Sequence, residues 1–133
     1  MSTDILNELP ATEIVEKIGN SSITAEAVTQ ACLDRIAVRE DAVKAWAYID
    51  PDYALAQARI LDDTEVKGPL HGLPIGVKDV IDTSDMPTQM QSPAYEDHQP
   101  KTDAACVAML RAAGAVILGK TVTCEFAGSF PQK

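Results

Sequence analysis

The chain has 133 residues and a mass of 14.2 kDa, the size of a single domain. Hydrophobic residues make up 46% of it, which provides for a core and excludes disorder throughout. The formal net charge of −9 disfavours contact with phosphate backbones, so we expect no direct nucleic-acid partner. Because no apolar run approaches the roughly 20 residues of a membrane span and the acidic start is unlike a signal peptide, we expect a cytoplasmic protein with no membrane contact.

The three cysteines, Cys32, Cys106 and Cys124, are odd in number and widely spaced. They form no disulfide framework, and no Cys-x-x-Cys pair indicates zinc. We interpret them as buried or unreactive thiols in a reducing compartment, and we expect no metal and no other cofactor.

The first half of the chain predicts helices and one short strand. A helix over residues 12–18 ends at Gly19-Asn20, and Thr24 caps a second helix. That second helix has apolar side chains at every fourth position: Val28, Cys32 and Ile36. Residues 45–49 are typical of a strand, in which Trp46 and Tyr48, two apart, are expected to share a core face.

Asp50-Pro51 combines an N-cap acceptor with proline at the first helical position. The helix that it begins has Ala54, Ala58 and Leu61 on one face. After the break at Gly68-Pro69, residues 74–81 favour a strand, and residues 82–101 are irregular.

The second half continues with a helix and a buried strand. Thr102-Asp103 is expected to cap the helix, with Val107 and Leu110 facing inward and Gly114 ending it. Residues 115–118 are a near-continuous apolar run, typical of a strand covered on both faces. The predicted fold class is therefore α/β: N-terminal helices, then the first strands and helices of a mixed sheet layered with helices.

Lys78 is the candidate catalytic residue, because it is a charged side chain within an otherwise apolar strand. Strand alternation places Lys78 and Asp79 on opposite faces, so they are not natural partners. If Lys78 faced inward, desolvation would lower its pKa and leave part of it neutral, able to accept a proton. The alternative is an edge-strand lysine whose ammonium group reaches solvent.

The sequence of residues 72–79, Gly-Leu-Pro-Ile-Gly-Val-Lys-Asp, resembles the lysine-bearing strand of the amidase signature family. Residues 82–87, 103–121 and 125–127 are similar to the segments that follow in this family, in the same order, and Ile23-Thr-Ala resembles its early helix start. The resemblance covers residues 11–128. It departs at Gln91, where many members have glycine or another small residue.

The resemblance implies that Lys78 is the base of a Ser–cisSer–Lys triad. In such a triad the neutral lysine accepts a proton through a bridging serine, and a second serine attacks the carbonyl of a small amide substrate. An acyl-enzyme forms, ammonia or an amine leaves, and water releases the acid. Backbone N–H groups of a loop rich in glycine and serine hold the oxyanion.

The family's two serines lie in a segment rich in glycine and serine after the Glu-Phe motif, and residues 1–133 contain no such segment. Ser129 follows Gly128 but lacks a bridging partner. Since family members are several times longer, we interpret residues 1–133 as the N-terminal part of one amidase-type domain, incomplete relative to the family fold. We expect no amide hydrolysis by these residues alone. We also expect residues 115–118 to form an exposed edge that promotes oligomers.

Two further functions stay open: a glutaminase-type A subunit of a tRNA-dependent amidotransferase, and a non-catalytic truncated remnant. A lysine that forms a Schiff base is a more distant alternative. Four other candidate sites receive structural interpretations. Neither His71 nor His98 is expected to be a base, Lys120 is expected to keep its ammonium group in solvent, and residues 79–85 do not form a calcium loop.

Overall fold

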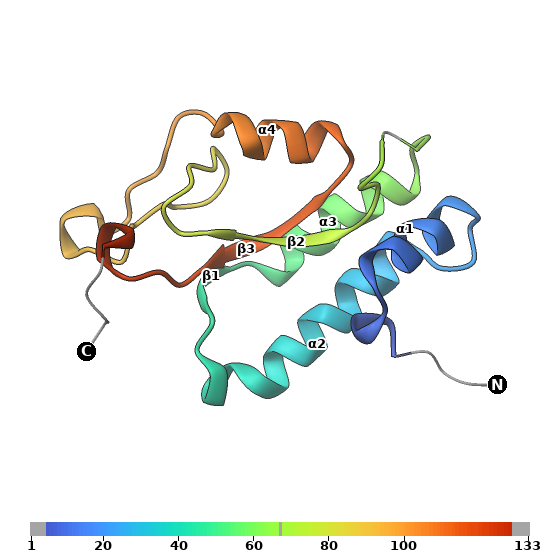
Figure 1. Cartoon of the computed structure of the whole chain (residues 1–133), viewed down its shortest axis with the longest axis horizontal. Helices are drawn as coiled ribbons and strands as arrows, with labels where there is room; N and C mark the ends of the chain where they lie inside the picture. Colours follow the sequence, from blue (N-terminus) through green and yellow to red (C-terminus); the bar gives the residue numbers. More distant parts are fainter. Residues whose placement is uncertain (1–4, 67, 129–133) are drawn as a thin grey trace.

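The computed structural model describes residues 5–66 and 68–128 (Figure 1). Four α-helices and three β-strands alternate along this part of the chain, with short 3-10 turns at Leu6–Glu8, Pro93–Tyr95 and Glu125–Ala127. In chain order they are α1 (Ala11–Gly19), α2 (Ala25–Val43), β1 (Trp46–Ile49), α3 (Pro51–Asp62), β2 (Pro74–Lys78), α4 (Ala105–Ala112) and β3 (Val116–Thr121).

The three strands form one mixed sheet in the order β1-β3-β2, in which β2 is parallel to β3 and β1 is antiparallel to it. Helix α4 lies on one side of the sheet and α2 on the other (Figure 1). The α/β class and the mixed, helix-layered sheet predicted from the sequence are confirmed.

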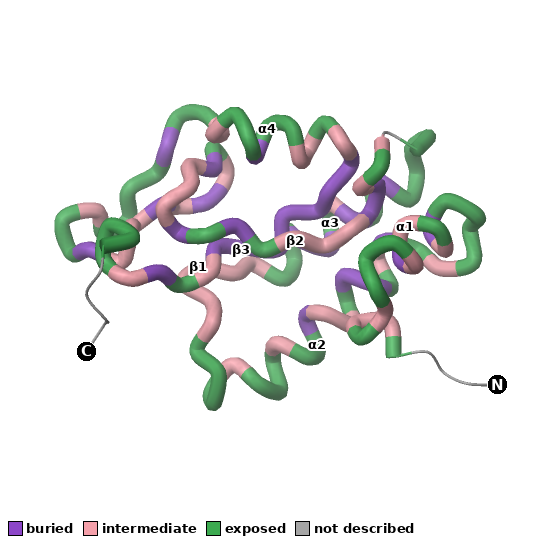
Figure 2. The backbone as a smooth tube through the Cα atoms, viewed as in Figure 1, coloured by how far each residue is buried: buried purple, intermediate pink, exposed green. Residues whose placement is uncertain are grey.

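Strand β3 is the centre of the sheet. Residues 115–118 are between 0% and 6% exposed, and the buried run continues to Lys120 (Figure 2). The prediction of a strand covered on both faces is confirmed. The expectation that the same residues form an exposed edge is wrong, because β2 pairs with them on one side and the Gln57 side chain of α3 bonds the backbone of Ile117 on the other. Oligomer formation stays a prediction.

Apolar clusters cover both faces of the sheet. Under α4 the cluster consists of Val77, Met86, Val107 and Ile117. The opposite face packs against α1, α2 and α3 through two clusters, formed by Ile14, Ile18, Ala25, Val28, Ala58, Leu61 and Val116, and by Leu33, Ala54, Leu55 and Leu118. Each helix therefore buries an apolar stripe on β3 or its neighbours.

A bulge in β1 separates Trp46 from Tyr48. Trp46 pairs with Thr121 and Tyr48 with Lys120, so the register shifts by one residue between the two pairs. Trp46 packs on the face of α2 and α3, and Tyr48 packs on the face of α4. The prediction that the two aromatic rings share one face is wrong, because the extra residue of the bulge reverses the alternation.

Helix α3 continues the sheet edge where β1 ends. Strand β1 reaches only to Gly119 of β3. Beyond this point the Gln57 amide donates to the Ile117 carbonyl at 3.0 Å and accepts from the Ile117 N–H at 3.3 Å. One side chain thus satisfies two backbone groups that a longer strand would have paired.

The predicted helix starts and stops are mostly confirmed. The Thr24 hydroxyl accepts from the Ala27 N–H at 3.1 Å, and the Asp50 carboxylate accepts from the Tyr53 N–H at 3.0 Å. Gly114 follows α4 with a φ of +92°. The expected cap at Thr102-Asp103 is wrong. The N-cap of α4 is Ala104, and the Asp103 carboxylate instead accepts from the backbone and hydroxyl of Ser84.

Strand β2 stops at Lys78, three residues earlier than predicted. The N–H groups of Val80 and Ile81 both donate to the Lys78 carbonyl, so the chain turns there. All three cysteines are free thiols; Cys106 is exposed, and Cys32 and Cys124 are half-buried. None of the helices in residues 5–66 and 68–128 has the length and apolar character needed to cross a bilayer.

Candidate active site

Lys78 lies at the carboxyl end of β2, an edge strand, and its side chain is exposed. Among the described residues, Lys78 is therefore not the inward-facing, desolvated lysine considered in the sequence analysis; it is an edge-strand lysine whose side chain reaches solvent. Its partner in the register is Thr121, while Asp79 points to the other face, as strand alternation predicts.

Two paired glycines, Gly76 and Gly119, lie on the Lys78 face of the sheet, under the Trp46 indole. Gly76 pairs with Gly119, and a Cβ built at Gly76 would meet the Trp46 indole and the Thr121 methyl at 3.0 Å. A larger residue at Gly76 would displace the indole. The glycine thus makes room for the indole beside Lys78.

Two loops meet at the carboxyl ends of β2 and β3, the end where parallel strands usually present ligand sites. The first loop follows β2, and the second holds the Glu125–Ala127 turn after β3. The Phe126 N–H donates to the Met90 carbonyl at 3.0 Å, and the Ser92 hydroxyl donates to the Glu125 carboxylate at 2.8 Å. Lys78 therefore ends a strand at the same edge where these loops are joined.

Both loops contain non-glycine residues in the left-handed region. The φ angles are 53° and 50° at Met90 and Gln91, and 50° and 54° at Phe126 and Ala127. Side chains are strained there, whereas glycine is not. A glycine at position 91 would adopt this conformation without strain. In this chain the Gln91 amide oxygen accepts from the Thr123 N–H at 3.5 Å.

Lys120, on the face opposite Lys78, is fully buried. Its ammonium group donates to the Pro87 carbonyl at 3.2 Å and the Thr88 hydroxyl at 2.5 Å, and it lies 3.5 Å from the Asp79 carboxylate. Burial lowers the pKa of Lys120, and the negative charge of Asp79 opposes that change. The expectation that this ammonium group lies in solvent is wrong, because the loop after β2 folds over it.

Asp79 is 1% exposed and is the charged partner of Lys120. Its Oδ1 also accepts from the Gln89 N–H at 3.2 Å, and its backbone carbonyl accepts from the Met90 N–H at 2.9 Å. Its Oδ2 is buried without a hydrogen bond from the described residues. The sequence analysis missed this pair. The signal was there, because Lys120, like Lys78, is a lysine within an apolar strand.

The other candidate residues lie elsewhere or have structural partners. The His98 ring is exposed and packs edge-on against Tyr95. The Asp85 carboxylate binds Arg111 through two hydrogen bonds of 2.6 and 2.7 Å. In residues 5–66 and 68–128 no group of three or more His, Cys, Asp or Glu side chains is arranged to hold a metal ion. Ser129 lies outside the described residues.

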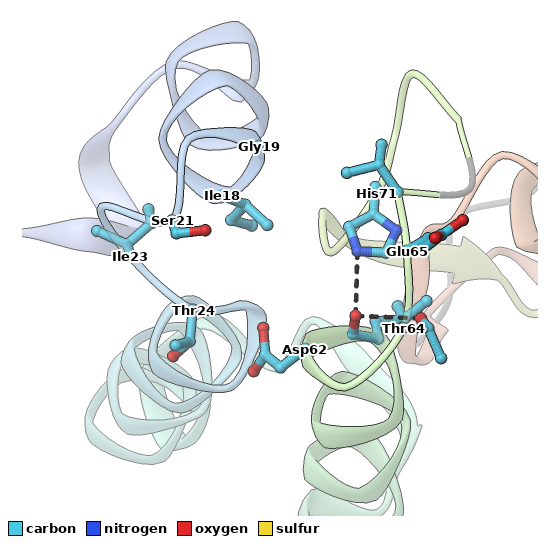
Figure 3. Close-up of a pocket in the computed structure, with 11 residues that line it drawn as sticks. Ile18, Gly19, Ser21, Ile23, Thr24, Asp62, Thr64, Glu65 and His71 are labelled. Atoms are coloured by element: carbon cyan, nitrogen blue, oxygen red, sulfur yellow. Dashed lines mark hydrogen bonds between the residues drawn. The ribbon is translucent and has the colours of Figure 1, made fainter.

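His71 borders a cavity of about 250 Å³ between α1, α2 and the end of α3 (Figure 3). It is buried, and its Nε2 is 3.1 Å from the Leu61 carbonyl. The nearby Asp62 carboxylate accepts from the N–H groups of Ala25 and Glu26 at 2.7 and 3.0 Å, closing the start of α2. His71 comes shortly before the first residue of β2, so the cavity lies at the opposite end of that strand from Lys78.

A model of the family described as Amidase matches residues 27–131. The chain belongs to the amidase family. This confirms the resemblance drawn from residues 72–79 and the segments after them.

Curated relatives carry amidase and amidotransferase names. The chain is 40% identical over 129 residues to amidase AmiD of Mycobacterium tuberculosis, covering 94% of this chain and 27% of that protein. It is 46% identical over 121 residues to the A subunit of the glutamyl-tRNA(Gln) amidotransferase of Acidothermus cellulolyticus, covering 88% of this chain and 24% of that protein. The chain thus spans about a quarter of the length of these relatives.

Solved structures give the same fold. The native peptide amidase of Stenotrophomonas maltophilia superposes with a TM-score of 0.82 at 35% identity, over 90% of this chain and 26% of that one. A fatty acid amide hydrolase superposes with a TM-score of 0.84 at 24% identity, over 92% and 23%, a likeness of fold alone. The three-stranded sheet and its helices are therefore a part of the amidase fold.

Proposed function

We propose that the chain is the N-terminal part of an amidase that hydrolyses a small carboxamide to an acid and ammonia, with Lys78 as its base. The observation that supports this most directly is the position of Lys78: exposed, at the carboxyl end of β2, on the sheet edge where the two loops join. Membership of the amidase family supports the reaction class.

In this mechanism the neutral Lys78 amine accepts a proton from a bridging serine, which takes one from the serine that attacks the carbonyl. Both serines and the oxyanion loop come from residues other than 5–128. The exposure of Lys78 suits this arrangement, since its amine faces away from Asp79 and Lys120 and is open to a further segment. We accordingly propose that residues 1–133 alone are inactive.

The second candidate is the glutaminase-type A subunit of a tRNA-dependent amidotransferase, which passes ammonia to a partner protein. The 46% identity to the corresponding protein of Acidothermus cellulolyticus favours it. The test is purification from the source cells followed by identification of bound proteins. A stoichiometric partner together with glutamine-dependent ammonia release would select this function, and carboxamide hydrolysis without a partner would select the first. A cytoplasmic location stays a prediction.

The role of Lys78 is tested on the product of the complete open reading frame, with ammonia release from a panel of carboxamides. Lys78→Ala should lower kcat about 10³-fold, in the range expected for loss of a general base. Lys101→Ala removes another exposed lysine and should leave kcat within about twofold. Equal activity of Lys78→Ala and the unmodified protein would refute the proposal.

The inactivity of residues 1–133 is tested in the same assay. Turnover by this piece that survives Lys78→Ala but is lost in Ser129→Ala would show that Ser129 acts without the lysine, and it would overturn the assignment of a triad.

A further inference from the structure

The ion pair of Lys120 and Asp79 lies next to Lys78, the candidate base, on the opposite face of the sheet. In the parallel register Val77 pairs with Lys120 and Lys78 pairs with Thr121. Lys120 is therefore the residue just before the register partner of Lys78. Asp79 is the next residue after Lys78. Lys120 on β3 and Asp79 just after β2 are thus both close to the Lys78 position, while their side chains lie on the other face.

The pair also holds the loop that follows β2. The Lys120 ammonium group donates to the Pro87 carbonyl and the Thr88 hydroxyl, and Asp79 accepts from the backbone of Gln89. The Asp79 N–H further donates to the Thr121 carbonyl at 2.9 Å, which ties the end of β2 to β3. The end of β2, the end of β3 and loop residues 87–90 are therefore joined at one buried point.

Stability alone is a poor reason for this arrangement. Lys120 is 0% and Asp79 is 1% exposed, and a buried ion pair gains little net stability over apolar residues of the same volume, because both charges lose their hydration. What such a pair does supply is a single geometry, since both groups need their partners in place.

We propose that Lys120 is a positioning residue of the amidase site: through Asp79 and Thr88 it sets the end of β2, and with it the Lys78 amine, against the loop at residues 87–92. The inference rests on the proposed role of Lys78 as base. Displacement of a catalytic group by about 1 Å costs roughly 10²-fold in rate, so loss of the pair should lower kcat and leave substrate binding nearly unchanged.

The experiment uses the product of the complete open reading frame and measures kcat, KM and thermal stability with a carboxamide. Lys120→Met keeps an unbranched side chain one atom shorter and removes the ammonium group, and kcat should fall 10- to 100-fold with KM within about threefold. The control for stability is Val107→Ala, a buried change in α4 that takes no part in the hydrogen bonds of the pair; it should lower the melting temperature and leave kcat unchanged.

A second pair of variants decides the matter if Lys120→Met does not fold. Thr88→Val removes the hydroxyl at constant shape and should lower kcat about 5- to 10-fold, while Thr88→Ser keeps the hydroxyl and should retain kcat. Unchanged kcat in Lys120→Met or Thr88→Val, or an equal loss in Val107→Ala, would overturn the inference. So would an effect confined to KM.

Lys78→Ala separates this inference from the proposed function. If Lys78→Ala is inactive while Lys120→Met retains full kcat, the positioning role fails and the base assignment stands. If Lys78→Ala is active, the base assignment fails and the positioning role fails with it.

Discussion

The junction between α4 and β3 depends on Gly114. This residue has a φ of +92°, and a Cβ at this position would lie 2.8 Å from the Cα of His71 and 3.2 Å from its backbone nitrogen. Hydrogen bonds join this junction to the segment that holds His71: the Gly72 N–H donates to the Gly114 carbonyl at 2.8 Å, and the Leu70 N–H donates to the Ala113 carbonyl at 3.1 Å. The added methyl group would therefore meet backbone held in place by hydrogen bonds.

We expect Gly114→Ala to destabilise the fold by about 2–5 kcal/mol. The left-handed conformation costs an alanine about 1–2 kcal/mol, and the contact with His71 adds an overpacking cost of about 1–3 kcal/mol. Gly19→Ala is the matched control. Gly19 is the last residue of α1, has nothing within 4 Å of its Cβ position, and should gain up to about 1 kcal/mol from the same substitution.

The assay is urea unfolding followed by the fluorescence of Trp46, the single tryptophan, which packs against the sheet beside Gly76 and Gly119. The two variants should move the midpoint in opposite directions at an unchanged slope. A Gly114→Ala protein within about 0.5 kcal/mol of the unmodified chain, or a Gly19→Ala protein as damaged as Gly114→Ala, would refute the reasoning from φ and Cβ distance.

Two further predictions concern carboxylates. Asp62→Ala removes both acceptors at the start of α2 and should cost about 1–2 kcal/mol in urea unfolding, whereas Asp63→Ala, an exposed neighbour, should cost less than about 0.5 kcal/mol; equal costs would contradict the cap. Burial raises the pKa of Asp103, but hydrogen bonds from Ser84 and the charge of Arg111 outweigh it and hold that pKa below its usual 3.8. The contribution of the Asp103 carboxylate to stability is thus present above its unfolded-state pKa and lost as the pH falls through its folded-state pKa. Asp103→Asn should therefore cost about 1 kcal/mol of unfolding free energy at pH 7 and progressively less below about pH 4. A cost independent of pH would refute this.

Local signals in the sequence predicted local structure well. Thr24, Asp50-Pro51 and Gly114 each act within one helical turn, so the residue itself determines the cap or the stop. The alternation of helix and buried strand likewise predicted the layered α/β class, because the apolar run of β3 has to be covered on both faces.

Predictions that depended on a distant partner failed. Asp103 looks like a cap, but Ser84 and Arg111 offer its carboxylate better donors from other segments. The bulge in β1 is likewise invisible in residues 45–49, since it arises from pairing with β3 more than 70 residues later. Separation along the chain, rather than weak propensity, limited these predictions.

The two strand lysines show the same limit at the candidate site. Lys78 and Lys120 each lie in an apolar strand, and nothing in their immediate neighbours separates an exposed lysine from a buried one. The structure separates them by register: Lys120 lies on the central strand, on the face that the loop after β2 covers, whereas Lys78 ends the edge strand on the opposite face. In the proposed mechanism, only a lysine whose amine stays accessible can accept a proton from the bridging serine. The buried lysine, held by Asp79 and Thr88, is instead suited to fix the frame from which the accessible one acts.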